Sequence, residues 1–240
     1  MHLKLDKIIA AAVIPVIFGT LLFKDSFMPS PVQQPNYKSN ENYTLQIELY
    51  DIYKIQQADI VMLGDSRTHG ANWNELLGRT SVIERGITMD ILEGMAARMN
   101  YIYKLKPKIC FINGGINDVF AWVPVDKIFQ TYTAVIMGLK ARNIIPVIQS
   151  CMFAAKDYGK AWKATPEIIK GRNNDLESLN KMLADYAKKN NIDYIEINSK
   201  LITSDNYLRP ELTWDGLHFR AAAYKIWADE VDKILRKYKL

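Results

Sequence analysis

A serine, a histidine and an aspartate occur in an order and spacing that suit nucleophilic acyl chemistry. Ser66 comes soon after the apolar run at 60–63, and Asp215 lies three residues before His218. Serine is a weak nucleophile unless a base lies within hydrogen-bond reach, and that base needs a third group to fix its tautomer. One tight turn can aim Asp215 and His218 at the same place, so these three residues are candidates for a nucleophile, its base and the orienting acid.

Two further segments offer hydrogen-bond donors for such a reaction. Gly86 follows the apolar stretch at 81–83, and Asn117 follows a second strand-like run at 109–112. Acyl transfer passes through a tetrahedral intermediate whose oxyanion needs preorganised donors. A glycine lets the backbone N–H approach closely, and an asparagine side chain offers an uncharged NH2 donor.

Together these segments resemble those of the SGNH hydrolases, also called the GDSL esterase/lipase family. The matching pieces are Gly64-Asp65-Ser66, Arg85-Gly86, Gly115-x-Asn117-Asp118 and Asp215-x-x-His218, within a stretch from about Ala58 to Tyr238. The resemblance implies Ser66 as nucleophile, His218 as base and Asp215 as its orienter. It also implies an oxyanion hole built from the Ser66 N–H, the Gly86 N–H and the Asn117 side chain.

The chain departs from the usual family pattern at two positions. Arg67 stands where the family usually has an apolar residue, and Glu84 stands where an asparagine is common before Arg-Gly. Because Arg67 adjoins the candidate nucleophile, it would either favour an anionic substrate or pair with a carboxylate. Asp65 and Asp118 are expected to tie loops through their side-chain oxygens, and His69 is expected to point away from the site.

Strands that alternate with helices must position these residues. Strand-like runs lie at 59–63, 81–84, 108–113, 144–149 and 193–197, and apolar residues recur at helical spacing between them. This alternation predicts an α/β fold with a parallel sheet and helices on both faces. The family resemblance implies a flavodoxin-like three-layer α/β/α sandwich, with five strands in the order 2-1-3-4-5 and all four motifs at the carboxyl edge.

The N-terminal region has a different composition. Residues 8–23 are apolar and uncharged, and Lys4 and Lys7 precede them. We therefore expect residues 1–26 to be an uncleaved membrane anchor, with secretion after signal cleavage as the alternative. The preceding lysines favour a cytoplasmic N-terminus and an exported catalytic domain. Residues 27–55 are rich in proline and polar side chains and are predicted to be a tether, which leaves 56–240 as the hydrolase domain.

Composition limits the remaining functions. The chain has 240 residues, a formal net charge of +5 and three scattered histidines. No basic stripe with interleaved aromatic residues is present, so we expect no nucleic-acid partner. No spacing of histidines, cysteines and carboxylates predicts a metal site, and no motif calls for a cofactor. The two cysteines, Cys110 and Cys151, are expected to be buried free thiols.

The substrate is less constrained by the sequence than the chemistry. The long connection at 151–171 contains Trp162, and Trp122 follows the asparagine motif. These aromatic residues would either stack on a sugar ring, hold an acyl chain or pack locally. The prediction is an exported esterase that removes short acyl groups, above all acetyl, from a carbohydrate or cell-envelope glycan. The alternatives are a lysophospholipase or thioesterase for longer acyl chains, a polysaccharide O-acyltransferase, and a catalytically silent glycan-binding module.

Overall fold

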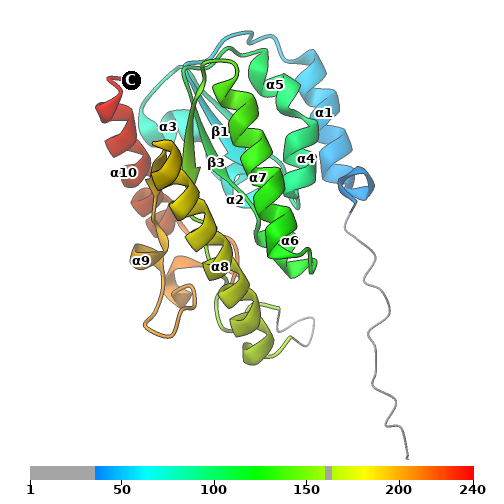
Figure 1. The fold of residues 1–240 in the computed structure, drawn as a ribbon, viewed down its shortest axis with the longest axis vertical. Coiled ribbons are helices and arrows are strands. Elements are labelled where there is room, and N and C mark those ends of the chain that lie inside the picture. The colour runs from blue at the N-terminus through cyan, green and yellow to red at the C-terminus, as the bar shows by residue number, and fades with distance from the viewer. Residues whose placement is uncertain (1–35, 160–163) are drawn as a thin grey trace, which may run out of the picture. The chain divides into compact units, whose positions relative to one another are not determined.

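A five-stranded parallel sheet forms the centre of the fold (Figure 1). The computed structural model describes residues 36–159 and 164–240. The strands are β1 (Ile60–Gly64), β2 (Val82–Gly86), β3 (Ile109–Asn113), β4 (Ile145–Gln149) and β5 (Asp193–Ile195). Their order in the sheet is β2-β1-β3-β4-β5, which confirms the predicted fold class and strand order.

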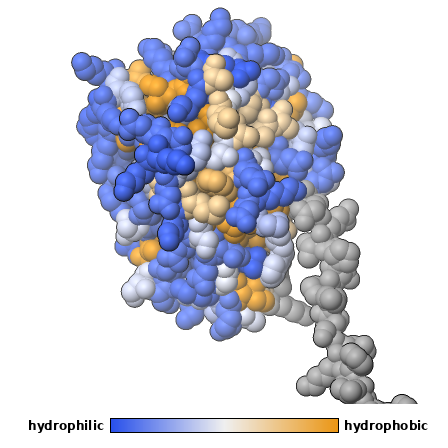
Figure 2. All heavy atoms as spheres, in the orientation of Figure 1, coloured by the Kyte–Doolittle hydropathy of each residue, from blue (hydrophilic) through white to orange (hydrophobic). Residues whose placement is uncertain are grey.

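Helices cover both faces of this sheet. In chain order they are α1 (Glu41–Ile52), α2 (Ser66–His69), α3 (Trp73–Leu77), α4 (Leu92–Ala97), α5 (Met99–Tyr103), α6 (Ile116–Phe120), α7 (Val125–Lys140), α8 (Pro166–Asn190), α9 (Asn198–Leu201) and α10 (Ala221–Lys237). Short 3₁₀ helices span Tyr37–Ser39 and Pro210–Leu212. Figure 2 shows a mostly hydrophilic surface on the viewed face, broken by smaller apolar areas.

Alternate residues of the central strands build two separate cores. Val61 and Ile112 belong to the core shared with α4, α5, α7 and α8. Met62 and Phe111 belong to the opposite core, which is shared with α3, α9 and α10. Because successive strand residues point to opposite faces, a strand covered on both faces must be apolar throughout. That requirement explains why β1 and β3 are buried along their whole length.

Part of the predicted tether is instead structured. Residues 41–52 form α1, which begins after the N-cap residue Asn40. Its one buried side chain is Tyr50, whose hydroxyl donates to the Gly86 carbonyl at 3.3 Å, while the Arg85 guanidinium lies 4.5 Å from its ring centroid. The prediction of a polar tether over 27–55 is therefore wrong for 41–52. A helix that buries a single ring and whose apolar residues do not gather on one face has too weak an apolar stripe to be recognised from sequence.

The predicted anchor at 1–26 and the first part of the tether lie outside the described residues. Among the residues that are described, no helix combines the length and the apolar character needed to cross a membrane.

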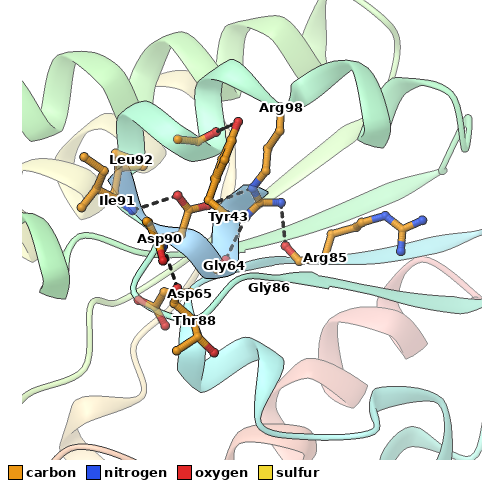
Figure 3. Close-up of polar contacts among 12 residues, drawn as sticks. Tyr43, Gly64, Asp65, Arg85, Gly86, Thr88, Asp90, Ile91, Leu92 and Arg98 are labelled. Carbon is orange, nitrogen blue, oxygen red and sulfur yellow. Dashed lines mark hydrogen bonds and ion pairs between the residues drawn. The ribbon is translucent and has the colours of Figure 1, made fainter. Parts of the chain in front are cut away.

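A buried ion pair joins the carboxyl ends of β1 and β2 (Figure 3). Both side chains of the pair, Asp90 and Arg98, are 0% exposed. The Arg98 guanidinium donates to Asp90 Oδ2, to the Gly64 carbonyl and to the Arg85 carbonyl, each at 2.9 Å. Burial raises the pKa of Asp90 to about 6 even though the Arg98 cation opposes that shift. The pair fastens the loop after β2 to the strand that leads to Ser66.

Asp118 holds a second connection beneath the site. Its two carboxylate oxygens each lie 3.1 Å from the Leu92 nitrogen, and both accept from that N–H at the start of α4. Burial raises the pKa of Asp118 to about 7, although the Leu92 N–H opposes that shift. The expected structural role of Asp118 is thus matched by its contacts.

Asp118→Asn should change how stability depends on pH. An unfolded aspartate has a pKa of about 3.9, below the value of about 7 in the folded protein. Between these values the folded protein keeps a proton that the unfolded chain has released, so this group lowers the free energy of unfolding as pH rises. The loss is at most about 1.4 kcal/mol per pH unit. Urea unfolding from about pH 4 to 8 should show that the asparagine variant escapes this loss.

The matched control is Asp185→Asn, which alters an exposed carboxylate on α8. This variant should follow the wild-type pH profile. Parallel profiles for wild type and Asp118→Asn would contradict a buried, protonated Asp118.

Candidate active site

Ser66, His218 and Asp215 form a hydrogen-bonded relay. His218 Nε2 lies 3.0 Å from Ser66 Oγ, and His218 Nδ1 lies 2.6 Å from Asp215 Oδ2. Ser66 is the first residue of α2, directly beyond β1, whereas the other two residues lie in the loop before α10. The fold thus brings together residues separated by about 150 positions in the chain.

Local hydrogen bonds shape the loop that carries His218. Asp215 Oδ1 accepts from the N–H groups of Leu217 at 2.9 Å and His218 at 2.7 Å. Thr213 Oγ1 donates to the His218 carbonyl at 2.7 Å. Partial burial opposes ionisation of Asp215, but the hydrogen bonds from His218 and Leu217 outweigh it and lower its pKa. The aspartate therefore stays ionised opposite the imidazole.

Arg67 is buried and is not among the residues that line the cleft around Ser66. Its side chain is 1% exposed and donates to the carbonyls of Leu217, Met152 and Phe153 at 2.9, 2.5 and 2.9 Å. Burial lowers its pKa, and the nearby Asp65 carboxylate opposes that shift. Arg67 therefore ties the nucleophile helix to the backbone beside His218. The sequence could not predict this role of Arg67, because its hydrogen-bond partners are backbone carbonyls from distant segments of the chain.

The relay lies in a cleft of about 810 Å³. Its lining includes Ser66, Met89, Asn117, Tyr158, Trp214, His218 and Arg220. The Trp214 ring is 64% exposed and stacks on the His218 ring at a centroid separation of 5.7 Å. Sequence reasoning missed Trp214, although its place next to Asp215 was a usable signal.

The structure describes one of the two tryptophans that were predicted to contact substrate. Trp122 stands outside the cleft lining, and the Arg172 guanidinium lies 3.7 Å from its ring centroid. The ring is 55% exposed and packs against this arginine of α8, so a contact between Trp122 and substrate stays a prediction. Trp162 lies outside the described residues.

The donors near Ser66 differ from the predicted set in one member. Asn117 lines the cleft, and its Nδ2 donates one hydrogen bond to the Asp90 carbonyl at 2.8 Å. The Gly86 N–H instead donates to the Glu84 carboxylate, and Gly86 is not part of the cleft lining. A Cβ on Gly86 would lie 2.5 Å from the His69 nitrogen. Position 86 therefore needs glycine so that the nucleophile turn can pack on β2, and the predicted oxyanion role of Gly86 is corrected.

Met89 lies in the loop after β2, three residues beyond Gly86. It lines the cleft and has a φ of 61°. The Asp90 N–H donates to the Ile87 carbonyl at 3.1 Å, so Met89 is the third residue of a tight turn. A left-handed conformation is costly for a non-glycine residue and often marks a functional loop. Its residue type gave no hint of this conformation.

The remaining reactive groups lie elsewhere. His69 Nδ1 is 3.6 Å from Glu84 Oε2, which removes it from the relay. Cys110 and Cys151 are buried free thiols, as predicted. Across the ranges 36–159 and 164–240, no group of histidine, cysteine and carboxylate side chains is arranged to hold a metal ion.

Known proteins resemble this chain both in sequence and in fold. N-acylneuraminate cytidylyltransferases of Streptococcus agalactiae are 25% identical over 201 residues, which cover 81% of this chain and 44% of theirs. The chain therefore spans less than half the length of these curated relatives. A putative acylhydrolase from Bacteroides fragilis superposes with a TM-score of 0.70 at 22% identity, over 85% of this chain and 99% of that one.

An acetyl xylan esterase superposes with a TM-score of 0.60 at 20% identity, over 73% of this chain and 98% of that one. At such identities the structural likeness establishes the fold. The family model described as GDSL-like Lipase/Acylhydrolase family matches residues 62–226, well over half of the sequence. On the strength of that match, the chain belongs to the GDSL-like lipase/acylhydrolase family.

Proposed function

We propose that this protein is a serine esterase that removes short acyl groups, above all acetyl, from a carbohydrate or cell-envelope glycan. Membership of an acylhydrolase family already implies hydrolysis of ester bonds. The observation that carries the finer assignment is the relay, in which His218 lies within hydrogen-bond distance of both Ser66 and Asp215. A hydroxyl, an imidazole and a carboxylate in this geometry make an activated nucleophile.

The reaction follows from the positions of these atoms. Ser66 Oγ attacks the ester carbonyl while its proton passes to His218 Nε2, and Asp215 stabilises the imidazolium that forms. When the tetrahedral intermediate collapses, His218 gives that proton to the departing alcohol. The acyl-serine is then hydrolysed by a water molecule that His218 deprotonates in the same way.

In this proposal three donors stabilise the oxyanion. The Asp90 carbonyl accepts one hydrogen of the Asn117 amide group, which leaves the second for the intermediate. The N–H groups of Ser66 and Met89 complete the hole in this proposal, because both residues line the cleft with Asn117. Met89 thus takes the role that the sequence assigned to Gly86.

Trp214 supports a sugar as the alcohol part of the ester. Its exposed ring stacks on His218, the residue that protonates the departing alcohol in this mechanism. Aromatic faces with polar neighbours suit a sugar ring, and Arg220 also lines this part of the cleft. The names of two similar proteins, an N-acylneuraminate cytidylyltransferase and an acetyl xylan esterase, are consistent with a carbohydrate substrate.

We further propose that the apolar run at 8–23 anchors the protein in a membrane, with the hydrolase unit on the outer side. The lysines that precede this run favour that orientation. An enzyme held in this way would meet glycans or other esters of the cell envelope.

Ser66→Ala should reduce hydrolysis of p-nitrophenyl acetate by at least about 10³-fold, and His218→Ala by a comparable factor, because the two side chains act as one unit. A fluorophosphonate probe should label Ser66 in the wild type and fail to label Ser66→Ala. Ser178→Ala, which alters an exposed serine on α8, is the matched control and should retain full activity. Retention of more than a few per cent of the activity in either relay variant, with folding verified by circular dichroism, would sink the assignment.

Trp214→Ala should weaken action on acetylated sugars more than action on p-nitrophenyl acetate. We expect kcat/KM to fall about tenfold or more for acetylated xylo-oligosaccharide or O-acetylated N-acylneuraminate, since a stacking surface is lost. Trp214→Phe should restore most of this loss. Equal effects on sugar and nitrophenyl esters would mean that Trp214 supports His218 and does not contact a glycan.

The full-length chain should sediment with membranes, whereas a chain beginning at Gln33 should be soluble and active. The shorter chain keeps α1 and all of the site while it lacks the apolar run. Protease added to intact cells should digest the hydrolase unit if it faces outward. Recovery of a secreted chain without about its first 26 residues would replace anchoring by signal cleavage.

A further inference from the structure

A second groove, of about 370 Å³, adjoins the catalytic cleft. The two share Met89, Asn117 and Tyr158 as lining residues. Its lining includes Phe120 and, from the segment that precedes α1, Asn36, Tyr37, Ser39 and Asn40. The segment that the sequence assigned to a tether therefore lies next to the reacting groups.

The chemistry of the relay determines which part of an ester can enter this groove. In the tetrahedral intermediate the departing alcohol must face His218, because that imidazole protonates it. The oxyanion must face Asn117 and Met89. The second groove contains these two residues but neither His218 nor Asp215. Its position on the side of the oxyanion donors, away from the base, matches the remaining substituent of the carbonyl carbon, which is the acyl group.

The lining of the groove combines apolar side chains with the uncharged polar side chains of Asn36, Ser39 and Asn40, and it suits a short acyl group. Ile91, Phe120 and Tyr37 present apolar surface, and the Phe120 ring packs edge-on against Tyr158 at 5.2 Å. The groove lacks an acidic or basic side chain among its lining residues. An acyl chain can therefore be buried there without desolvating a charge.

Specific contacts hold this wall against the hydrolase unit. Asn40 Nδ2 donates to the Thr88 carbonyl at 2.8 Å, next to Met89. The Tyr43 hydroxyl donates to the Gly94 carbonyl at 3.4 Å, and Tyr43 lies beside the Asp90–Arg98 pair (Figure 3). A Cβ on Gly94 would lie 2.0 Å from Asp90 Oδ1 and 3.0 Å from Tyr37 Cβ, so glycine here makes room for the buried carboxylate and also for this segment. These contacts make residues 36–40 a fixed boundary of the groove.

We propose that residues 36–40 form the wall of the acyl subsite and that Tyr37 sets the longest acyl group the enzyme accepts. This inference rests on the proposed esterase function. The Tyr37 ring lines the groove and packs edge-on against Tyr43 at 4.9 Å. An acyl chain that outgrows the groove meets this ring and the backbone behind it. The N-terminal segment is thereby a determinant of substrate specificity as well as a connection.

The test measures kcat/KM for p-nitrophenyl esters from acetyl to octanoyl, with the full chain in detergent. Wild type should prefer acetyl. Tyr37→Ala should raise the octanoyl-to-acetyl ratio about tenfold or more, because pocket boundaries discriminate by such factors per group. Tyr37→Trp should lower the ratio, which keeps the test informative if the alanine variant is unstable. Tyr37→Phe retains the ring and should resemble wild type.

Trp122→Ala is the matched control, because this aromatic residue lies two positions from Phe120 but outside the groove lining. Its octanoyl-to-acetyl ratio should equal that of wild type. An unchanged ratio in both Tyr37→Ala and Tyr37→Trp, with acetyl hydrolysis retained, would overturn the acyl wall. So would a change confined to a series of acetyl esters with different alcohols, which would place the alcohol in this groove. Absence of Ser66-dependent turnover in wild type would instead overturn the proposed function, and the acyl wall with it.

Discussion

The buried pair of Arg98 and Asp90 is the constraint on which the site depends. Buried carbonyl groups at the carboxyl edge of a parallel sheet must be paired. Arg98 satisfies those of Gly64 and Arg85 while it binds the Asp90 carboxylate. Loss of either charge would leave the other buried and uncompensated, at a cost of about 3–5 kcal/mol. The loop that follows β2 is thereby fixed relative to the nucleophile turn.

The consequences of this pair reach the reacting groups through the backbone. Ser66 lies two residues beyond Gly64, and the Asp90 carbonyl orients the Asn117 amide group. On the other side of the cleft, Arg67 plays a comparable part, because it pairs the carbonyl of Leu217, the residue before His218. Each arginine joins two segments of the candidate site, so the relay and the neighbouring donors are held by buried cations that do not line the cleft.

The residues before the sheet belong to the same unit as the site. Residues 33–240 cluster as one compact unit, and within it α1 packs on β2 through Tyr50 while Asn40 binds the loop that carries Met89. A change in the segment that leads into α1 would therefore shift the loop that carries Met89, which lines the cleft. In an anchored enzyme the connection to the membrane would begin directly at the acyl subsite.

The sequence by itself determined the fold class, the strand order through family resemblance, and the candidates Ser66, Asp215, His218 and Asn117. These followed because apolar runs of strand length and short polar motifs are local patterns. Only the tertiary structure decided the contacts of Arg67, Gly86 and Trp122 and the backbone conformation of Met89. Arg67 and Trp122 found partners in distant segments, Gly86 was required for close packing, and Met89 adopted a left-handed turn that its side chain does not signal. These features depend on long-range contacts and on backbone conformation, and residue type and spacing predict neither.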